Sequence, residues 1–325
     1  MTGTVLLSGT VLVTSRSFSQ GSVDTASRLE AAGFDILTAA HHHDLAELAT
    51  LLPDAVAWIA GTGQITHEHI ALAPNLRIIA RYGVGTDAVD VEAAEDAGVL
   101  VSNTPTANSE SVADLALALL LSSLRKIPVG DRAVRRGDWS AIRGREIGSL
   151  TVGIAGYGRI GRSVASKILA LGGSVIAYDP FVRSDERVTM VDDFAALAAC
   201  DAVSLHAPGG QQLITAEWLA AASGMALVNT ARGDLVDEHA VASALSSGAL
   251  ASYAADTLDS EKNPDAVSPL LAPDLADLVT ITPHLGAQTI DAVDRMSIGT
   301  TDDVLLALSG VAPRNPVLSA RKARR

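Results

Sequence analysis

The sequence feature that most restricts the fold is a glycine-rich turn between an apolar segment and a helix-forming one. Residues 152–155 are apolar and predict a buried strand, and the turn that follows is Gly156-Tyr-Gly-Arg-Ile-Gly161. Gly156 permits a tight turn, and Gly161 lets the helix predicted over residues 162–171 pack close to the strand. Because parallel strands are joined by crossover helices, this pattern predicts a parallel α/β unit.

A second apolar segment completes the unit and ends in an acidic residue. Residues 174–178 predict the next strand, and Asp179 lies eighteen positions after Gly161. Gly158 would let the backbone approach a pyrophosphate, and the helix N-terminus would offer N–H donors to its phosphates. A carboxylate at 179 would accept hydrogen bonds from an adenosine ribose and repel a 2′-phosphate. The sequence therefore predicts a Rossmann domain that prefers NAD to NADP, although Arg183 lies nearby.

Strand and helix patterns alternate on both sides of this turn. Aromatic residues make up only 3% of the chain, so the cores must be aliphatic, as in helices packed on parallel sheets. A helix predicted over about 287–308 and the tail after it are too short to fold alone, so we expect them to pack on the first domain. The predicted fold class is α/β with two domains. A Rossmann dinucleotide-binding domain, residues 105–287, is inserted in a smaller flavodoxin-like substrate-binding domain, residues 1–104 and 288–325.

Polar residues follow three apolar strands of the second half of the chain: Arg232, Glu261 and His284. The carboxyl ends of parallel strands meet at one edge of a sheet, where open α/β sheets bind their ligands. An arginine can bind a carboxylate bidentately, and a histidine oriented by a carboxylate can exchange a proton with a carbonyl oxygen. Each residue alone is also typical of an ordinary loop, so spacing by itself leaves this site open.

Five motifs in order resemble those of the D-isomer-specific 2-hydroxyacid dehydrogenase family. They are Arg81-Tyr-Gly-Val-Gly-Thr-Asp87, Asn103-Thr-Pro-Thr-Ala-Asn-Ser-Glu-Ser-Val-Ala113, the glycine-rich turn, Asn229-Thr-Ala-Arg-Gly-Asp-Leu-Val-Asp-Glu238 and Thr282-Pro-His-Leu-Gly-Ala287. The similarity runs from about Thr10 to Pro316. It is strongest to short phosphoglycerate-dehydrogenase-like members without a C-terminal regulatory domain.

The resemblance implies a role for each matching position. Arg232 would bind the substrate, His284 would be the general acid/base, and Glu261 would be the glutamate paired with that histidine. The substrate-binding residues would be Arg81, Val84, Gly85, Asn108, Arg232 and His284. The cofactor-binding residues would be Gly156, Tyr157, Gly158, Arg159, Ile160, Gly161, Asp179, His206, Ala207, Pro208, Thr230, Ala231, Asp256, Gly286 and Ala287.

The activity implied is the NAD-dependent interconversion of a 2-keto acid and a D-2-hydroxy acid in a cleft between the domains. The nearest resemblance favours 3-phosphoglycerate; glyoxylate, hydroxypyruvate or another small 2-keto acid is the alternative. Relatives that reduce phosphohydroxypyruvate usually carry a basic residue after the third strand, where this sequence has Ile59-Ala-Gly-Thr-Gly-Gln64. Arg16, Arg81, Arg143 or Arg145 would have to supply that charge. An NAD-sensing interaction protein, like the corepressors built on this fold, is the alternative from another class.

Charge and composition limit the partners and the location. The net charge of −13 disfavours nucleic acids and anionic membranes, and no apolar run is long enough to span a bilayer. The sequence shows no signal peptide and a single cysteine, so a cytoplasmic location is expected. The resemblance implies a homodimer joined through about residues 108–147.

Several conspicuous residues are expected to play no part in the chemistry. His41-His-His43 is interpreted as a surface loop and not as a metal site, because consecutive residues rarely converge on one ion. His67 and His69 are predicted to be exposed on a short helix. Cys200 is predicted to be a small buried side chain.

Overall fold

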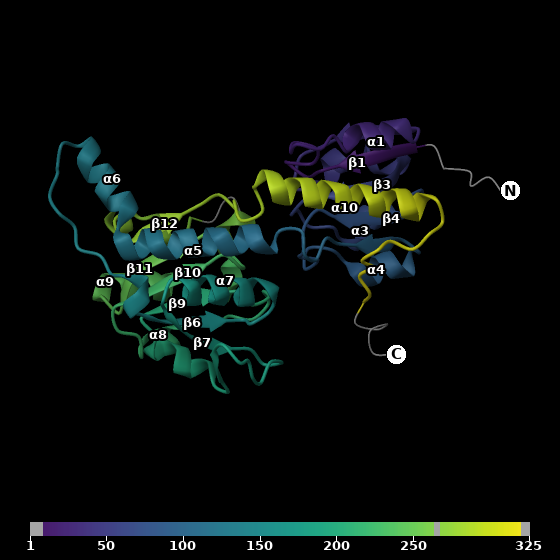
Figure 1. Cartoon of the computed structure of the whole chain (residues 1–325). Helices are drawn as coiled ribbons and strands as arrows, with labels where there is room; N and C mark the ends of the chain where they lie inside the picture. The colour runs from purple at the N-terminus through teal and green to yellow at the C-terminus, as the bar shows by residue number, and fades with distance from the viewer. Residues whose placement is uncertain (1–8, 263–266, 320–325) are drawn as a thin grey trace. The chain divides into compact units, whose positions relative to one another are not determined.

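The computed structural model describes residues 9–262 and 267–319, and Figure 1 traces the chain through it. The chain divides into two compact units. Residues up to Asn108 and from Ala287 onwards make unit 1, and Ser109–Gly286 make unit 2. The sequence-based boundaries lay after residues 104 and 287, so residues 105–108 and Ala287 belong to unit 1 instead. The chain ends that the prediction gave to the first domain, 1–8 and 320–325, lie outside the described residues.

Unit 1 is built on a five-stranded parallel sheet in the order β2-β1-β3-β4-β5. This is the strand order of flavodoxin-like folds. The central strand β3 is buried at every position, as expected where helices cover both faces of a sheet. The strands are β1 (Gly9–Val13), β2 (Phe34–Thr38), β3 (Ala55–Ala60), β4 (Ile78–Arg81) and β5 (Leu100–Ser102).

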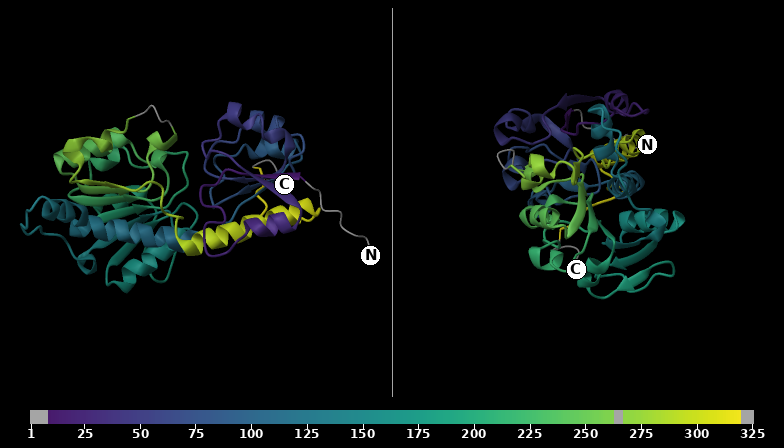
Figure 2. Two further views of the ribbon diagram at one scale, coloured as in Figure 1. Left: turned by 90° about the horizontal axis from the view of Figure 1, so that it is seen from above. Right: turned by 90° about the vertical axis from the view of Figure 1, so that its left-hand side faces the viewer.

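Helices cover both faces of this sheet. The helices of unit 1 are α1 (Ala26–Ala31), α2 (Leu45–Leu48), α3 (His67–Ala71), α4 (Val91–Asp96) and α10 (Ile290–Leu308). α1 and α10 lie on one face, where Met296 and Val304 of α10 join the core formed with β1, β3 and β4 (Figure 2). The other face packs Trp58 of β3 against the remaining three helices. Beyond α10, the Val317 N–H donates to the Val101 carbonyl, so the returning segment also joins the sheet of unit 1.

Unit 2 is built on a seven-stranded parallel sheet in the order β12-β11-β10-β9-β6-β7-β8. Counted from β6, the order is that of a Rossmann fold with one strand added at the far edge. The predicted α/β fold class, with a Rossmann domain and a second α/β domain, is therefore confirmed. The strands are β6 (Thr151–Ala155), β7 (Ser174–Tyr178), β8 (Thr189–Val191), β9 (Ala202–Leu205), β10 (Met225–Asn229), β11 (Leu250–Ala255) and β12 (Val279–Ile281).

Two apolar cores cover the faces of the second sheet. The helices of unit 2 are α5 (Ser109–Arg125), α6 (Ile127–Arg135), α7 (Arg159–Ala170), α8 (Ala216–Leu219) and α9 (Glu238–Ser247). Leu120 of α5 and Ile168 of α7 lie in the core on one face, and Trp218 of α8 and Val241 of α9 lie in the core on the other (Figure 2). The long helix α5 thus forms part of the body of unit 2.

The ends of two helices differ from the sequence prediction. The sequence predicts a helix that Ser109 caps, that runs through about Lys126 and that Pro128 stops. α5 ends at Arg125 because Lys126 adopts a left-handed conformation (φ 55°), and Pro128 lies in the first turn of α6, where its missing N–H leaves no helical bond unmade. Ser109 is the first residue of α5 and not its N-cap. α7 begins at Arg159, inside the glycine-rich turn, and not at residue 162.

Two histidines predicted to be exposed are buried. His43 is 4% exposed and His69 is 5% exposed. The His43 ring packs 5.0 Å from the ring of Trp58, and the Nε2 atom of His69 lies 3.0 Å from the His43 carbonyl oxygen. The surface interpretation is therefore wrong for these two residues, whereas Cys200 is buried as predicted. Among the described residues, no group of His, Cys, Asp and Glu side chains is arranged to hold a metal ion.

None of the described helices has both the length and the apolar character that crossing a bilayer requires.

Candidate active site

The glycine-rich turn leaves open space over the N-terminus of α7. Gly156 has a left-handed φ of 94°, and a Cβ there would lie 2.6 Å from the backbone carbonyl of His206. A Cβ on Gly161 would lie 2.0 Å from the Gly156 carbonyl oxygen. Packing therefore requires both residues to be glycine. A Cβ on Gly158 would meet no described protein atom within 4 Å, and no described side chain caps the helix there, so a phosphate group has room to approach its N–H groups.

Asp179 lies at the end of β7, where the sequence predicts a contact with a ribose. Its Oδ2 atom accepts the Tyr157 N–H at 2.8 Å, and its Oδ1 atom accepts the Phe181 N–H at 2.8 Å. These bonds fix the carboxylate and leave each oxygen a further lone pair for a hydroxyl donor. The Tyr157 side chain is buried in the core of unit 2, with the Arg162 guanidinium 4.4 Å from its ring centre. Only the main chain of Tyr157 can therefore face a ligand. Phe181, two residues after Asp179, was not predicted as a site residue, and its side chain is 92% exposed.

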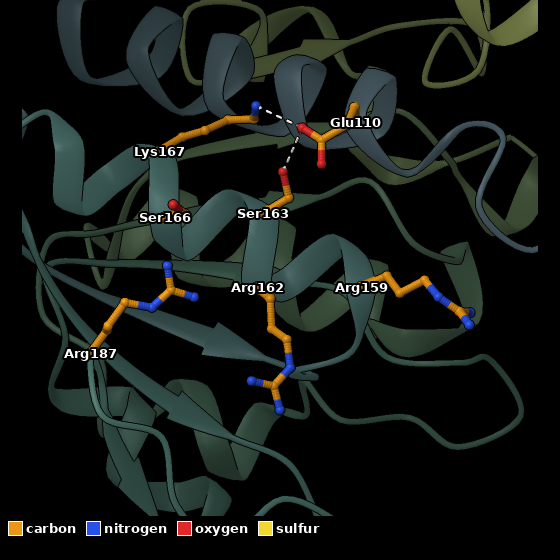
Figure 3. Close-up of a pocket in the computed structure, with 7 residues that line it drawn as sticks. All are labelled: Glu110, Arg159, Arg162, Ser163, Ser166, Lys167 and Arg187. Atoms are coloured by element: carbon orange, nitrogen blue, oxygen red, sulfur yellow. Dashed lines mark hydrogen bonds and ion pairs between the residues drawn. The ribbon is translucent and has the colours of Figure 1, made fainter.

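The outer face of α7 carries basic side chains that are engaged by carboxylates. Figure 3 shows Lys167 and Ser163 pointing toward Glu110 of α5, which accepts a hydrogen bond from each. Arg162 pairs with Asp185 at 2.8 Å. The exposed Arg159 extends away from this cluster at the first position of α7, where the sequence predicts a pyrophosphate contact (Figure 3).

Buried polar atoms directly after β9 and β10 have no protein partner among the described residues. They are the Nδ1 atom of His206, directly after β9, and the Oγ1 atom of Thr230, directly after β10. Burial lowers the pKa of His206 to about 3, so its ring is neutral at pH 7, and the Ser204 hydroxyl lies 2.9 Å from its Nε2 atom. Buried polar atoms are normally hydrogen-bonded, so these two mark places for polar ligand atoms. Together with the open glycine turn, they fit a dinucleotide.

His284 and Glu261 form a close pair after β12 and β11. The Nδ1 atom of His284 lies 2.8 and 3.1 Å from the two carboxylate oxygens of Glu261. The side chains are 30% and 39% exposed, respectively. An Nδ1–H that donates to the carboxylate leaves Nε2 as the ring atom that can exchange a proton with a ligand.

The loop that carries His284 is held by Asp256, at the end of β11. The buried carboxylate of Asp256 accepts the hydroxyl of Thr282 at 2.5 Å and the N–H groups of Leu285 and Gly286 at 2.7 Å each. Its backbone carbonyl also accepts the His284 N–H at 3.1 Å. These bonds maintain the left-handed backbone of His284 (φ 56°). The resemblance assigns Asp256 to the cofactor, but in the structure its oxygens also shape the histidine loop.

Arg232 follows β10 in a turn organised by Asn229. The Asn229 side chain, which is fully buried, donates to the Arg232 carbonyl at 2.8 Å and accepts the Ala231 N–H at 3.0 Å. The Asn229 carbonyl accepts the Asp256 N–H at 2.9 Å, which links this turn to the histidine loop. The Arg232 guanidinium donates to the Ala231 carbonyl at 2.8 Å. Asn229 belongs to one of the family-like motifs but was not itself predicted as a site residue; its place at the end of a buried strand was the available signal.

Unit 1 carries the other predicted substrate residues. Arg81 is 5% exposed and donates to the Ala60 carbonyl at 2.6 Å and the Gly85 carbonyl at 3.0 Å. These bonds shape the loop after β4. The N–H groups of Val84 and Gly85 have no acceptor among the described residues, and the Oδ1 atom of Asn108 is buried without a described partner. Ala287 also belongs to unit 1, whereas every other predicted cofactor residue belongs to unit 2.

Comparison with known proteins gives this arrangement its context. Residues 117–286 match the model of the NAD-binding domain of D-isomer-specific 2-hydroxyacid dehydrogenases. The chain belongs to this family. The sequence-based resemblance is thereby confirmed, and this segment of unit 2 is the NAD-binding domain of a family member.

Individual relatives agree with this membership. The chain is 42% identical over 280 residues to D-3-phosphoglycerate dehydrogenase of Mycobacterium tuberculosis, covering 82% of this chain and 52% of that protein. It is 34% identical over 275 residues to hydroxypyruvate reductase of Thermotoga maritima, covering 82% and 89%. The solved structure of the TT0316 protein from Thermus thermophilus has a TM-score of 0.85 and 33% identity, covering 95% and 100%. This dehydrogenase-family chain spans about half the length of the mycobacterial relative.

Proposed function

We propose that the chain is an NAD-dependent oxidoreductase that interconverts a 2-keto acid and a D-2-hydroxy acid. The observation that carries this proposal is the His284–Glu261 pair, held in a defined loop of the unit that also contains the glycine turn. A carboxylate-oriented imidazole is suited to acid/base work at a carbonyl or hydroxyl oxygen. Bound NADH would supply the hydride for the carbonyl carbon.

His284 would handle the proton. With Nδ1–H directed at Glu261, protonated Nε2 gives its proton to the keto oxygen during reduction and takes it back from the hydroxyl during oxidation. Glu261 is a positioning residue in this scheme, because it fixes the ring orientation and balances the charge of the imidazolium. Asp256 supports both by holding the loop around His284.

Arg232 would hold the substrate's carboxylate and keto oxygen. Its guanidinium can donate in parallel to two oxygen atoms, which orients a planar 2-keto acid. The Asn229 bonds fix the main chain on both sides of this residue. In unit 1, the N–H groups of Val84 and Gly85 have no acceptor among the described residues, which supports the expectation that they bind a carboxylate.

Phosphohydroxypyruvate, with 3-phosphoglycerate as its reduced partner, is the first substrate candidate. Support comes from the 42% identity to the mycobacterial D-3-phosphoglycerate dehydrogenase. Hydroxypyruvate or glyoxylate is the second candidate, because the Thermotoga maritima hydroxypyruvate reductase is covered over 89% of its length.

The test follows NADH absorbance during incubation with phosphohydroxypyruvate, hydroxypyruvate, glyoxylate and pyruvate. Turnover should fall at least about a hundredfold in His284→Gln, because general acid catalysis contributes factors of this order. His239→Gln, on the exposed face of α9, is the matched control and should keep the wild-type rate. Tight NADH binding without turnover of any acid would reject the enzyme and favour the NAD-sensing alternative.

We also propose a homodimer joined through about residues 108–147. Figure 1 shows α6 and the loop after it extending from the sheet of unit 2. This segment exposes Trp139 (81%), Ile127 (57%), Ile142 (44%) and Val134 (41%). A cluster of exposed apolar side chains is typical of an interface. Trp139→Glu should shift the mass measured by light scattering from dimer to monomer; a wild-type monomer, or a variant that remains dimeric, would contradict the proposal.

A cytoplasmic location stays a prediction from the sequence.

A further inference from the structure

The glutamate that pairs with His284 is carried by one short helical turn after β11. Residues Asp259–Lys262 form this turn, and the Glu261 N–H donates to the Leu258 carbonyl at 3.2 Å. A single turn gains few hydrogen bonds for the backbone order that it requires, so it is weak by itself. The Glu261 carboxylate can therefore stay at the His284 ring only if neighbouring segments hold the turn. We call Asp259–Lys262 the glutamate turn.

The first neighbour of the glutamate turn is Gly233, the residue after Arg232. A Cβ on Gly233 would collide with the backbone nitrogen of Asp259 and with the carbonyl group of Leu258. The backbones of the two segments are therefore in direct contact. This packing limits how closely the two segments approach each other, but it provides no directional bond that would fix the orientation of the glutamate turn.

The second neighbour, Glu238, provides such bonds. It is the first residue of α9, and its Oε1 atom accepts the Asp259 N–H at 2.9 Å. Its Oε2 atom accepts the hydroxyl of Ser268, which is 3% exposed and whose oxygen accepts the Leu270 N–H at 3.2 Å. Glu261 lies in the sequence between the two residues that this one carboxylate holds. Hydrogen bonds to a carboxylate are stronger than those between neutral groups.

Glu238 is itself presented from a fixed part of unit 2. The Asp237 side chain caps α9 by accepting the Ala240 N–H at 3.0 Å, and the Asp237 N–H donates to the Ile214 carbonyl at 2.9 Å. α9 packs on β11, and its Val241 side chain lies fully buried in the core. The half-buried Glu238 carboxylate is thus attached to the rigid body that also carries the strand before the glutamate turn.

We propose that Glu238 is a positioning residue for the dehydrogenase reaction. By holding the Asp259 N–H, it keeps the Glu261 carboxylate 2.8 Å from the Nδ1 atom of His284. Glu238 makes no hydrogen bond to either member of that pair, so it acts only through the backbone of the glutamate turn. This inference rests on the proposed function, in which Glu261 orients the imidazole that exchanges the proton.

The kinetic test compares three substitutions of Glu238. Glu238→Ala should lower kcat about tenfold, because a hydrogen bond to a charged group is lost, and leave the Kd of NADH within about twofold. Glu238→Asp keeps the charge but is one methylene shorter, so it should lose kcat like Glu238→Ala while keeping Tm. Glu238→Gln retains an oxygen for the Asp259 N–H and an amide nitrogen for the Ser268 hydroxyl oxygen, so it should retain most of the wild-type kcat.

The matched control is Glu217→Ala. Glu217 is also an acidic residue in the first turn of a helix of unit 2, α8, but its exposed side chain makes no hydrogen bond or ion pair with the described residues. Its removal changes the charge at a helix N-terminus in the same way as Glu238→Ala does. The control should therefore keep the wild-type kcat.

A double-variant comparison separates positioning from general stability. In the Glu261→Ala background, adding Glu238→Ala should change kcat less than about twofold, because the carboxylate that Glu238 positions is already absent. A purely structural role would instead lower kcat by the same factor with and without Glu261, and that factor would follow the loss of Tm.

Nitrogen-15 NMR of histidine-labelled protein gives a readout that needs no turnover. Which ring nitrogen of a neutral histidine carries the proton is set by its hydrogen-bond partners. The signals of His284, assigned by their loss in His284→Gln, should show the proton on Nδ1 in wild type and in Glu217→Ala. The Nδ1-protonated population should fall in Glu238→Ala, because the Glu261 acceptor is no longer held in place.

The results separate the positioning role from the proposed function. Equal kcat in wild type and Glu238→Ala, or the same loss of kcat with and without Glu261, would overturn the positioning role and leave the dehydrogenase activity standing. If the wild type reduces no acid, the proposed function fails, and NMR decides the positioning role. A loss of the Nδ1-protonated form in Glu238→Ala then supports it, whereas an unchanged His284 tautomer, or a wild type without a proton on Nδ1, overturns it.

Discussion

Lowering the pH from 7 to 5 should destabilise the folded chain through His43. Burial lowers the pKa of this imidazole from 6.5 to about 4. The unfolded chain therefore takes up the proton near pH 6.5, whereas the folded chain does so only near pH 4. The stability contribution is complete above pH 6.5 and is lost as the pH falls toward 4. At about 1.4 kcal/mol per pKa unit, His43 alone should remove about 2 kcal/mol from the free energy of unfolding between pH 7 and 5.

Equilibrium urea unfolding at pH 7, 6 and 5, followed by circular dichroism, measures the free energy of unfolding of wild type and of His43→Gln at each pH. The variant loses the ring that accepts the Thr14 proton, so we expect it to be less stable at pH 7. Its stability should nevertheless fall by about 2 kcal/mol less between pH 7 and 5, because it has no imidazole at that position to protonate. His206, whose pKa burial lowers to about 3, contributes equally to both proteins and cancels. Parallel pH dependences in the two proteins would show that burial of the His43 ring makes no such contribution to stability.

Three further predictions concern unit 2. Gly158→Ala should fold normally but bind NADH at least about tenfold more weakly in a fluorescence titration, because its methyl group enters the open space over α7. Gly161→Ala should instead lower Tm, because its methyl group would lie 2.0 Å from a backbone oxygen. Asp179→Ala should raise KM for NAD far more than KM for NADP, and equal changes would contradict the predicted ribose contact. Asp256→Asn should lower kcat about tenfold or more without a matching loss of Tm, since an amide nitrogen cannot accept the Gly286 N–H; an unchanged kcat would show that the loop keeps its shape without the carboxylate.

The apolar segments 152–155 and 174–178 predicted two strands of unit 2, which the structure has as Thr151–Ala155 and Ser174–Tyr178. Both lie inside the sheet, so they are short apolar runs, one followed by Gly156 and the other preceded by Gly173. β8 (Thr189–Val191) was missed because it lies at the edge of the sheet, where none of its residues is buried. This short strand offers too little buried apolar surface for the sequence alone to show it.

The sequence could predict which residues make up the candidate site, but not the hydrogen bonds between them. The resemblance paired Glu261 with His284, and the two side chains lie in contact. The hydrogen bonds that Asp256 makes to residues 282–286 depend on how the loops after β11 and β12 pack together in the folded chain. The spacing of these residues in the sequence does not show that packing. Burial of His43 depends likewise on Trp58 and Thr14, which belong to other segments of the chain. A run of three histidines is polar in composition, so the sequence alone placed it at the surface.

The assignment of α10 to unit 1 has a consequence for the order of folding during synthesis. Met296 and Val304 belong to the core built on β1, β3 and β4, although nearly 180 residues of unit 2 separate them from the rest of unit 1. The strands of unit 1 that are synthesised first therefore cannot complete their core until α10 has been synthesised. Unit 2 is one continuous segment and can fold as soon as its last residue has been synthesised. Domains usually fold from the N-terminus onwards. Here we expect the reverse, so that unit 1, with its buried His43, acquires its final structure after the unit that is inserted into it.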